Sequence, residues 1–202
     1  MSDAPALQAD QTVYRAALNA FALVYSLSGS YIEVYGREFV PPPGTPLIIA
    51  ANHIHNFDPY VLTRGIPPES GRTVQFMAKK ELFVGPVGWV LRRGGTFPVD
   101  RGANDVGSVR TALRVLQAGG TLGIFPEGTR GGGEMHAGVA LLSRRGRAPI
   151  LPAGICHQGR RWVLRLGEPI PHTLSAKELM RELETEINRL KQPIAQNLHL
   201  NR

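Results

Sequence analysis

The chain has 202 residues, long enough for one domain with a sizeable core, and its 43% hydrophobic fraction is ordinary for a globular protein. Its formal net charge of +7 favours an anionic partner, but the arginines lie outside any nucleic-acid motif, so we expect a membrane surface and no nucleic acid. The single cysteine, Cys156, excludes an intramolecular disulfide framework and a cysteine-based zinc knuckle.

The N-terminal segment is predicted to be a disordered tail over 1–10, followed by an amphipathic helix over 11–30. The first residues are acidic and polar, unlike a secretory signal, so the cytoplasm is the expected compartment. Polar residues interrupt the uncharged run over 16–32, which falls short of the roughly 20 apolar residues of a membrane span. Two alternatives stay open: a helix lying on the bilayer surface, or one packed against the domain's own sheet. One face of the predicted helix carries Tyr14, Leu18, Phe21 and Tyr25.

Alternating apolar and amphipathic segments follow over 31–192, and 193–202 is predicted to be a frayed tail. Predicted strands cover 31–35, 46–51, 73–78, 95–99, 121–125, 148–152 and 161–166. Predicted helices cover 58–65, 86–92, 103–118, 137–145 and 175–191, and Ser175 with Glu178 forms a capping box for the last. This alternation predicts a single α/β domain with a mixed, mostly parallel sheet flanked by helices. The segment 82–93 is predicted to be a buried helix or, alternatively, a second membrane contact.

The most informative local pattern follows the predicted strand 46–51. His53 stands five residues before Asp58, and Asp58-Pro59 is predicted to open a helix, with the aspartate as N-cap. An imidazole beside a carboxylate on a strand-to-helix turn can act as a general base near neutral pH. The alternative is that Asp58 is only a cap and His53 only a loop residue.

Three further predicted strands are followed or interrupted by arginine, glycine or proline residues. The strand 121–125 stops at Pro126-Glu127-Gly128-Thr129-Arg130, where glycine lets backbone N–H groups approach an anion and arginine can grip a phosphate with two donors. The segment 94–101 ends at Arg101, and the segment 148–155 is apolar and punctuated by proline. The first of these strand ends predicts a loop that binds an anionic ligand.

Together, and in this order, the four segments resemble the glycerolipid acyltransferase family. The family's motif Asn-His-x4-Asp falls on Asn52, His53 and Asp58, and Phe-Pro-Glu-Gly-Thr-Arg is intact at 125–130. A Gly-x-x-Phe-x-x-Asp-Arg type motif falls on 94–101, a fourth motif on 149–152, and the likeness covers roughly 12–170. Three departures from the usual family pattern bear on the acceptor rather than on acyl transfer: His55, Gly131 and His136.

The resemblance implies a glycerol-3-phosphate acyltransferase-like domain over 31–192, which moves a fatty acyl group from an acyl thioester to the free hydroxyl of 1-acyl-glycerol-3-phosphate. His53 would be the general base and Asp58 would hold it, with direct transfer in a ternary complex. The implied acceptor site, for phosphate and glycerol, consists of Arg101, Glu127, Gly128, Thr129 and Arg130. The implied supporting residues are Asn52, Lys79 and Pro152.

The implied partners are lysophosphatidic acid, acyl-coenzyme A or acyl-carrier protein as co-substrate, and the anionic inner face of the cell membrane, to which the protein would bind peripherally. No cofactor is expected, and no metal, because further histidines do not extend His53 and His55 to a known ligand spacing. Two alternatives remain: another acceptor, such as glycerol 3-phosphate or a different lyso-lipid, and a non-catalytic lipid-binding protein of the same fold.

Overall fold

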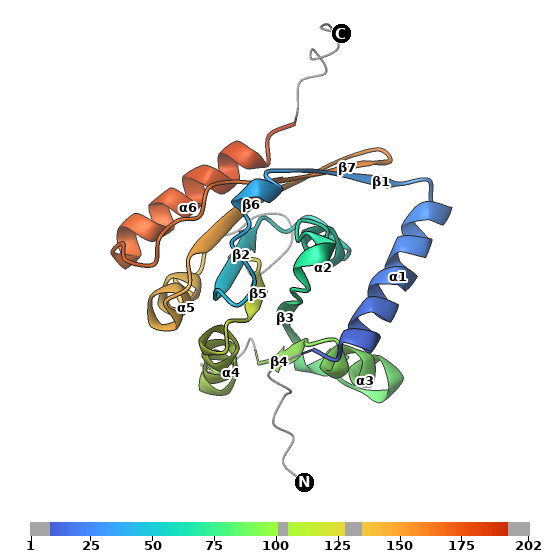
Figure 1. Cartoon of the computed structure of the whole chain (residues 1–202), viewed down its shortest axis with the longest axis horizontal. Coiled ribbons are helices and arrows are strands. Elements are labelled where there is room, and N and C mark those ends of the chain that lie inside the picture. The colour runs from blue at the N-terminus through green and yellow to red at the C-terminus, as the bar shows by residue number, and fades with distance from the viewer. Residues whose placement is uncertain (1–8, 101–104, 128–134, 194–202) are drawn as a thin grey trace, which may run out of the picture.

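The computed structural model describes residues 9–100, 105–127 and 135–193. Within these ranges seven strands form one sheet in the order β1-β7-β6-β2-β5-β3-β4 (Figure 1). Neighbouring strands there run parallel except for β6 and β7, which are antiparallel, so the predicted mixed and mostly parallel sheet is confirmed. The strands are β1 (Tyr31–Tyr35), β2 (Leu47–Ala51), β3 (Val74–Lys79), β4 (Phe97–Val99), β5 (Thr121–Ile124), β6 (Ile150–Gln158) and β7 (Arg161–Leu166).

Helices cover both faces of this sheet. Helices α4, α5 and α6 pack on one face, and α1 and α2 on the other (Figure 1). The predicted capping box at the start of α6 is confirmed, since the side chains of Ser175 and Glu178 each accept a hydrogen bond from the other's backbone N–H. The α-helices are α1 (Gln11–Leu27), α2 (Asp58–Thr63), α3 (Gly85–Arg93), α4 (Val106–Gln117), α5 (Gly138–Gly146) and α6 (Ala176–Leu190), with 3-10 turns at Arg37–Phe39, Pro68–Ser70 and Lys80–Leu82.

Strand β6 is longer than predicted. The apolar run indicated 148–152, whereas the strand continues to Gln158. Its first half pairs with β2, and its second half pairs with β7 across the turn at Gly159, whose φ is +61°. The hairpin ladder stabilises the extension, although its last residues are polar and exposed, so the hydrophobic pattern could not reveal it.

Strand β2 is buried on both faces and anchors the centre of the molecule. Leu47, Ile49 and Ala51 join the core beneath α1 and α2, whereas Ile48 and Ala50 join the core beneath α4, α5 and α6. Successive side chains of a strand point to opposite faces, which explains this alternation. The residues that follow Ala51 therefore start from a rigid position.

Helix α1 packs along the domain through one face and exposes the other. Asp10 caps its start by accepting hydrogen bonds from the N–H groups of Thr12 and Val13. Tyr14 accepts a hydrogen bond from the backbone N–H of Val74, and Tyr25 is buried. The outer face leaves Leu23, Val24 and Leu27 exposed. Among the residues that the structure describes, no helix is long and apolar enough to cross a membrane.

Candidate active site

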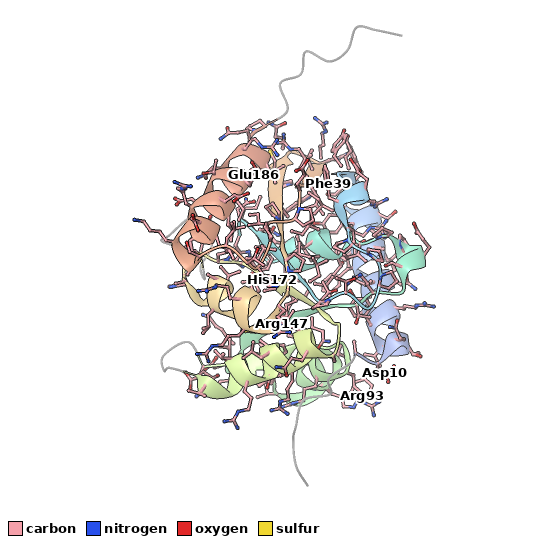
Figure 2. All side chains as sticks on the ribbon, turned by 60° about the vertical axis from the view of Figure 1, so that its left-hand side comes forward. Asp10, Phe39, Arg93, Arg147, His172 and Glu186 are labelled. Carbon is pink, nitrogen blue, oxygen red and sulfur yellow. The ribbon has the colours of Figure 1, made fainter. Side chains whose placement is uncertain are left out.

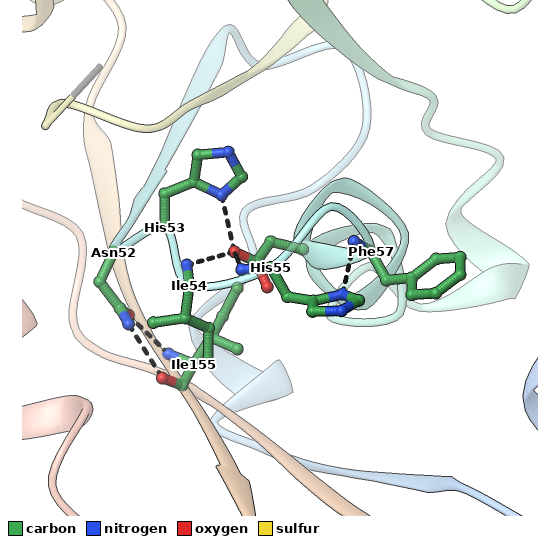
Figure 3. Close-up of polar contacts among 7 residues, drawn as sticks. Asn52, His53, Ile54, His55, Phe57 and Ile155 are labelled. Atoms are coloured by element: carbon green, nitrogen blue, oxygen red, sulfur yellow. Dashed lines mark hydrogen bonds and ion pairs between the residues drawn. The ribbon is translucent and has the colours of Figure 1, made fainter. Parts of the chain in front are cut away.

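The turn between β2 and α2 is fastened to the sheet by Asn52. Its side-chain Nδ2 donates to the carbonyl oxygen of Ile155 at 2.9 Å, and the N–H of Ile155 donates to its Oδ1 at 2.8 Å (Figure 3). Asn52 is buried, so these bonds satisfy polar atoms that would otherwise lack water. The predicted supporting residue thus ties the end of β2 to β6 and fixes the position from which His53 projects.

His53 and Asp58 form the predicted pair. The His53 Nδ1 lies 2.7 Å from the Asp58 Oδ2, and the side-chain exposures are 16% and 0% (Figure 3). A carboxylate is an acceptor, so it selects the tautomer that carries the proton on Nδ1. The lone pair then lies on Nε2, on the opposite side of the ring. The geometry suits a general base whose imidazolium form is stabilised by a buried anion.

The sequence predicted Asp58 as the N-cap of α2, and that prediction was wrong. Phe57 is the cap residue and Asp58 is the first helical residue. The Asp58 carboxylate points back into the preceding turn, where Oδ2 accepts hydrogen bonds from the N–H groups of Ile54 at 2.6 Å and His55 at 2.8 Å (Figure 3). One oxygen thus shapes the turn and also contacts the imidazole, a contact that a role as cap alone does not require.

An aromatic stack connects this pair to β5. The rings of His53 and Phe125 are stacked with centroids 4.4 Å apart, and Phe76 stacks behind Phe125 at 6.2 Å. Gly123 makes this arrangement possible, because a Cβ there would stand 2.1 Å from the ring of Phe76. Phe125 therefore fixes the plane of the imidazole, a role that the motif itself did not reveal.

The predicted acceptor residues are only partly within the described structure. Glu127 is half-buried just beyond β5, at the edge of the sheet where β2 also ends. Lys79 is exposed at the end of β3, and Pro152 is buried inside β6 opposite Ala50, away from solvent. The remaining predicted residues, Arg101, Gly128, Thr129 and Arg130, lie outside the described residues.

The end of β4 is held by acidic side chains. Lys80 forms an ion pair with Asp100. Asp105 accepts hydrogen bonds from the backbone N–H groups of Asp100 and Ser108, and these donors hold the pKa of its carboxyl below the usual value. The residues just after β4 and just before α4 are therefore fixed by side-chain contacts.

A second aromatic group lies beside the turn and was not predicted. His55 stacks on Phe57 and meets the ring of Trp162 edge-on, with centroids 5.2 and 5.5 Å apart. His157 stacks on Trp162 at 3.9 Å. His157 and Trp162 lie on the β6–β7 hairpin, about a hundred positions after His55 in the sequence, so no local pattern could indicate the contact. No group of three or more His, Cys, Asp or Glu among the described residues could hold a metal ion.

Comparisons with known proteins agree with this geometry. A family model described as acyltransferase matches residues 31–187. The chain is 34% identical over 144 residues to the 1-acyl-sn-glycerol-3-phosphate acyltransferase of Bacillus subtilis, which covers 70% of each protein. It is 32% identical over 120 residues to the lyso-ornithine lipid O-acyltransferase of Pseudomonas aeruginosa, covering 57% of this chain and 42% of the relative.

A solved structure has the same fold. The 1-acyl-sn-glycerophosphate acyltransferase PlsC of Thermotoga maritima matches with a TM-score of 0.71 at 22% identity, covering 87% of this chain and 77% of the other. The carboxyl ends of β2 and β5, with the His53–Asp58 pair between them, thus lie in an architecture shared with that protein.

Proposed function

Because this chain belongs to the acyltransferase family, we propose that it transfers a fatty acyl group from an acyl thioester to the free hydroxyl of 1-acyl-glycerol-3-phosphate, forming phosphatidic acid. The observation that carries the proposal is the 2.7 Å contact between His53 and the fully buried Asp58 at the end of β2. The name of the relative from Bacillus subtilis supports this choice of acceptor.

The proposed reaction is a direct transfer. The Nε2 of His53 removes the proton of the acceptor hydroxyl while the hydroxyl oxygen attacks the thioester carbonyl carbon. The tetrahedral intermediate then expels the thiolate, which receives the proton from the imidazolium, so the imidazole is regenerated. Asp58 stabilises the imidazolium while it exists, as an aspartate does in a catalytic triad. The thioester is carried by acyl-coenzyme A or acyl-carrier protein.

The test of this function is product analysis by mass spectrometry. The purified protein is given one acyl thioester and, in turn, lysophosphatidic acid, glycerol 3-phosphate and a lyso-lipid without a phosphate monoester. Phosphatidic acid as the main product supports the proposal. A second candidate, another lyso-lipid acceptor, is favoured by the departures at His55, Gly131 and His136 and by the relative named for a lyso-ornithine lipid. Preferred acylation of the phosphate-free lipid would establish it instead.

Arg130 is expected to bind the acceptor phosphate, on the strength of the motif in the sequence. Arg130→Lys keeps the charge but loses the bidentate fork, so the KM for lysophosphatidic acid should rise about tenfold or more, with the KM for the thioester unchanged. Arg101→Ala should act in the same direction. The exposed Arg144 of α5 offers a matched control, because Arg144→Lys should change neither constant. Initial rates against each substrate decide the matter, and equal KM values for wild type and Arg130→Lys would remove the assignment.

The acceptor resides in a bilayer, and we propose that the protein binds peripherally to the anionic inner face of the cell membrane. Helices α1 and α3 lie on one side of the domain (Figure 1), joined by the ion pair of Asp10 and Arg93 at 3.0 Å. Both expose apolar side chains, and α3 ends in Arg92 and Arg93, a pattern that suits the headgroup boundary. The exposed residues are Leu23, Val24 and Leu27 on α1, and Val87 and Trp89 on α3.

A flotation assay with vesicles checks this surface. The double variant Leu27→Ser with Val87→Ser should lower the bound fraction on anionic vesicles about tenfold, because two exposed apolar side chains no longer enter the bilayer. Leu141→Ser changes an equally apolar residue on α5, on the opposite side of the sheet, and should bind like the wild type. Equal loss in both variants would contradict the assignment of α1 and α3 as the membrane face.

A further inference from the structure

Two complementary polar atoms are buried beside the catalytic pair. The Oδ1 of Asp58 and the hydroxyl of Tyr25 are both inaccessible, and neither has a hydrogen-bond partner in the described part of the chain. Asp58 is 0% exposed and Tyr25 is 6% exposed. A buried carboxylate oxygen without a donor is destabilising, and so is a buried hydroxyl without an acceptor. One is an acceptor and the other a donor, so each supplies what the other lacks.

The packing of Tyr25 places it against the start of α2. Its ring centroid lies 5.5 Å from that of Phe57 and 5.1 Å from that of Tyr60, which flank Asp58 and Pro59 along the chain. Trp162 of β7 closes the third side at 5.9 Å. Three aromatic contacts therefore hold Tyr25 of α1 against the segment that contains Asp58.

The charges around Tyr25 agree with this placement. Burial raises the pKa of the Tyr25 hydroxyl, and the negative charge of Asp58 and the neighbouring Tyr60 raise it further. The titratable groups that act on Tyr25 come from α2, whereas Trp162 on β7 contributes none. The hydroxyl therefore keeps its proton and remains a donor at physiological pH.

We propose that Tyr25 is a positioning residue, which donates a hydrogen bond toward Asp58 Oδ1 through one bridging water molecule. A single water can satisfy both atoms and costs little entropy. The bond would prevent rotation of the carboxylate, so that Oδ2 keeps its contacts with His53 and the turn. Helix α1 would then serve the reaction with its inner face while its outer face meets the bilayer.

The kinetic part of the test rests on the proposed function. Tyr25→Phe removes only the hydroxyl, and it should lower kcat about three- to tenfold without changing either KM, because a looser carboxylate misplaces the base. Tyr14→Phe is the matched control: the residue lies on the same helix, and its hydroxyl meets the backbone N–H of Val74 instead. That variant should keep kcat within about twofold of the wild type.

A second readout needs no substrate. The His53 Nδ1–H proton gives a downfield NMR resonance when it is held by a carboxylate. In Tyr25→Phe it should move upfield and exchange faster with water, whereas Tyr14→Phe should leave it in place. An unchanged resonance in Tyr25→Phe would overturn the inference, whatever the acceptor proves to be. If the wild type acylates none of the acceptors but the resonance shifts, the proposed function fails and the role of Tyr25 stands.

Discussion

His53→Ala is expected to lower kcat by about 10²- to 10⁴-fold, the range that a positioned general base contributes. The imidazole holds its Nδ1 toward Asp58 and leaves Nε2 for the acceptor hydroxyl. The fold should survive, because the side chain lies on a turn at the edge of the core, 16% exposed. Turnover is measured with saturating thioester and lysophosphatidic acid, and unfolding is followed by circular dichroism.

The control for His53→Ala is the same substitution at His172, which lies beside α5 near the start of α6 (Figure 2). It should leave kcat unchanged, and both variants should unfold at similar temperatures. A folded His53→Ala variant that turns over at nearly the wild-type rate would refute the role of His53 as base.

Asp58→Asn should lower kcat by a similar factor, about 10²- to 10⁴-fold. The amide oxygen can still accept from the N–H groups of Ile54 and His55, but the charge that stabilises the imidazolium is lost. The free energy of unfolding should therefore fall by only about 1 kcal/mol. Rates and chemical denaturation are measured on the same preparation.

Asp58→Ala separates the two tasks of this carboxylate. It removes the acceptor of both backbone N–H groups as well as the charge. The free energy of unfolding should therefore fall by roughly 2–4 kcal/mol, which is more than the fall in Asp58→Asn. If Asp58→Asn kept its turnover and lost stability instead, the aspartate would serve the turn alone.

The fold was largely predictable because its strands are short apolar runs that end at glycine, proline or polar residues. The His53–Asp58 contact was predictable for a related reason: five residues separate the two, and a strand-to-helix turn can close that distance. The direction of the Asp58 carboxylate was not, because an aspartate before a proline fits an N-cap as well as an acceptor for the preceding turn.

The parts of the site that escaped prediction come from distant segments. Phe125 meets His53 only because β5 pairs with β2, and Trp162 meets His55 only because β7 follows β6 as a hairpin. Sequence spacing carries no information on these neighbours. The roles of Arg101, Gly128, Thr129 and Arg130 remain predictions from the motifs, since they lie outside the described residues.

Because β1 lies at the edge of the sheet and pairs with β7, it must wait during synthesis for a strand that is made much later. Within the described sheet β1 pairs only with β7, and Glu33 of β1 binds Arg161, 128 positions later. At ribosomal rates of about 5–20 residues per second, α1 and β1 emerge roughly ten seconds before that partner. Trp162, which closes one side of the pocket around Tyr25, arrives equally late. Tyr25 can therefore meet Phe57 and Tyr60 of the growing chain well before Trp162 closes the remaining side of its surroundings.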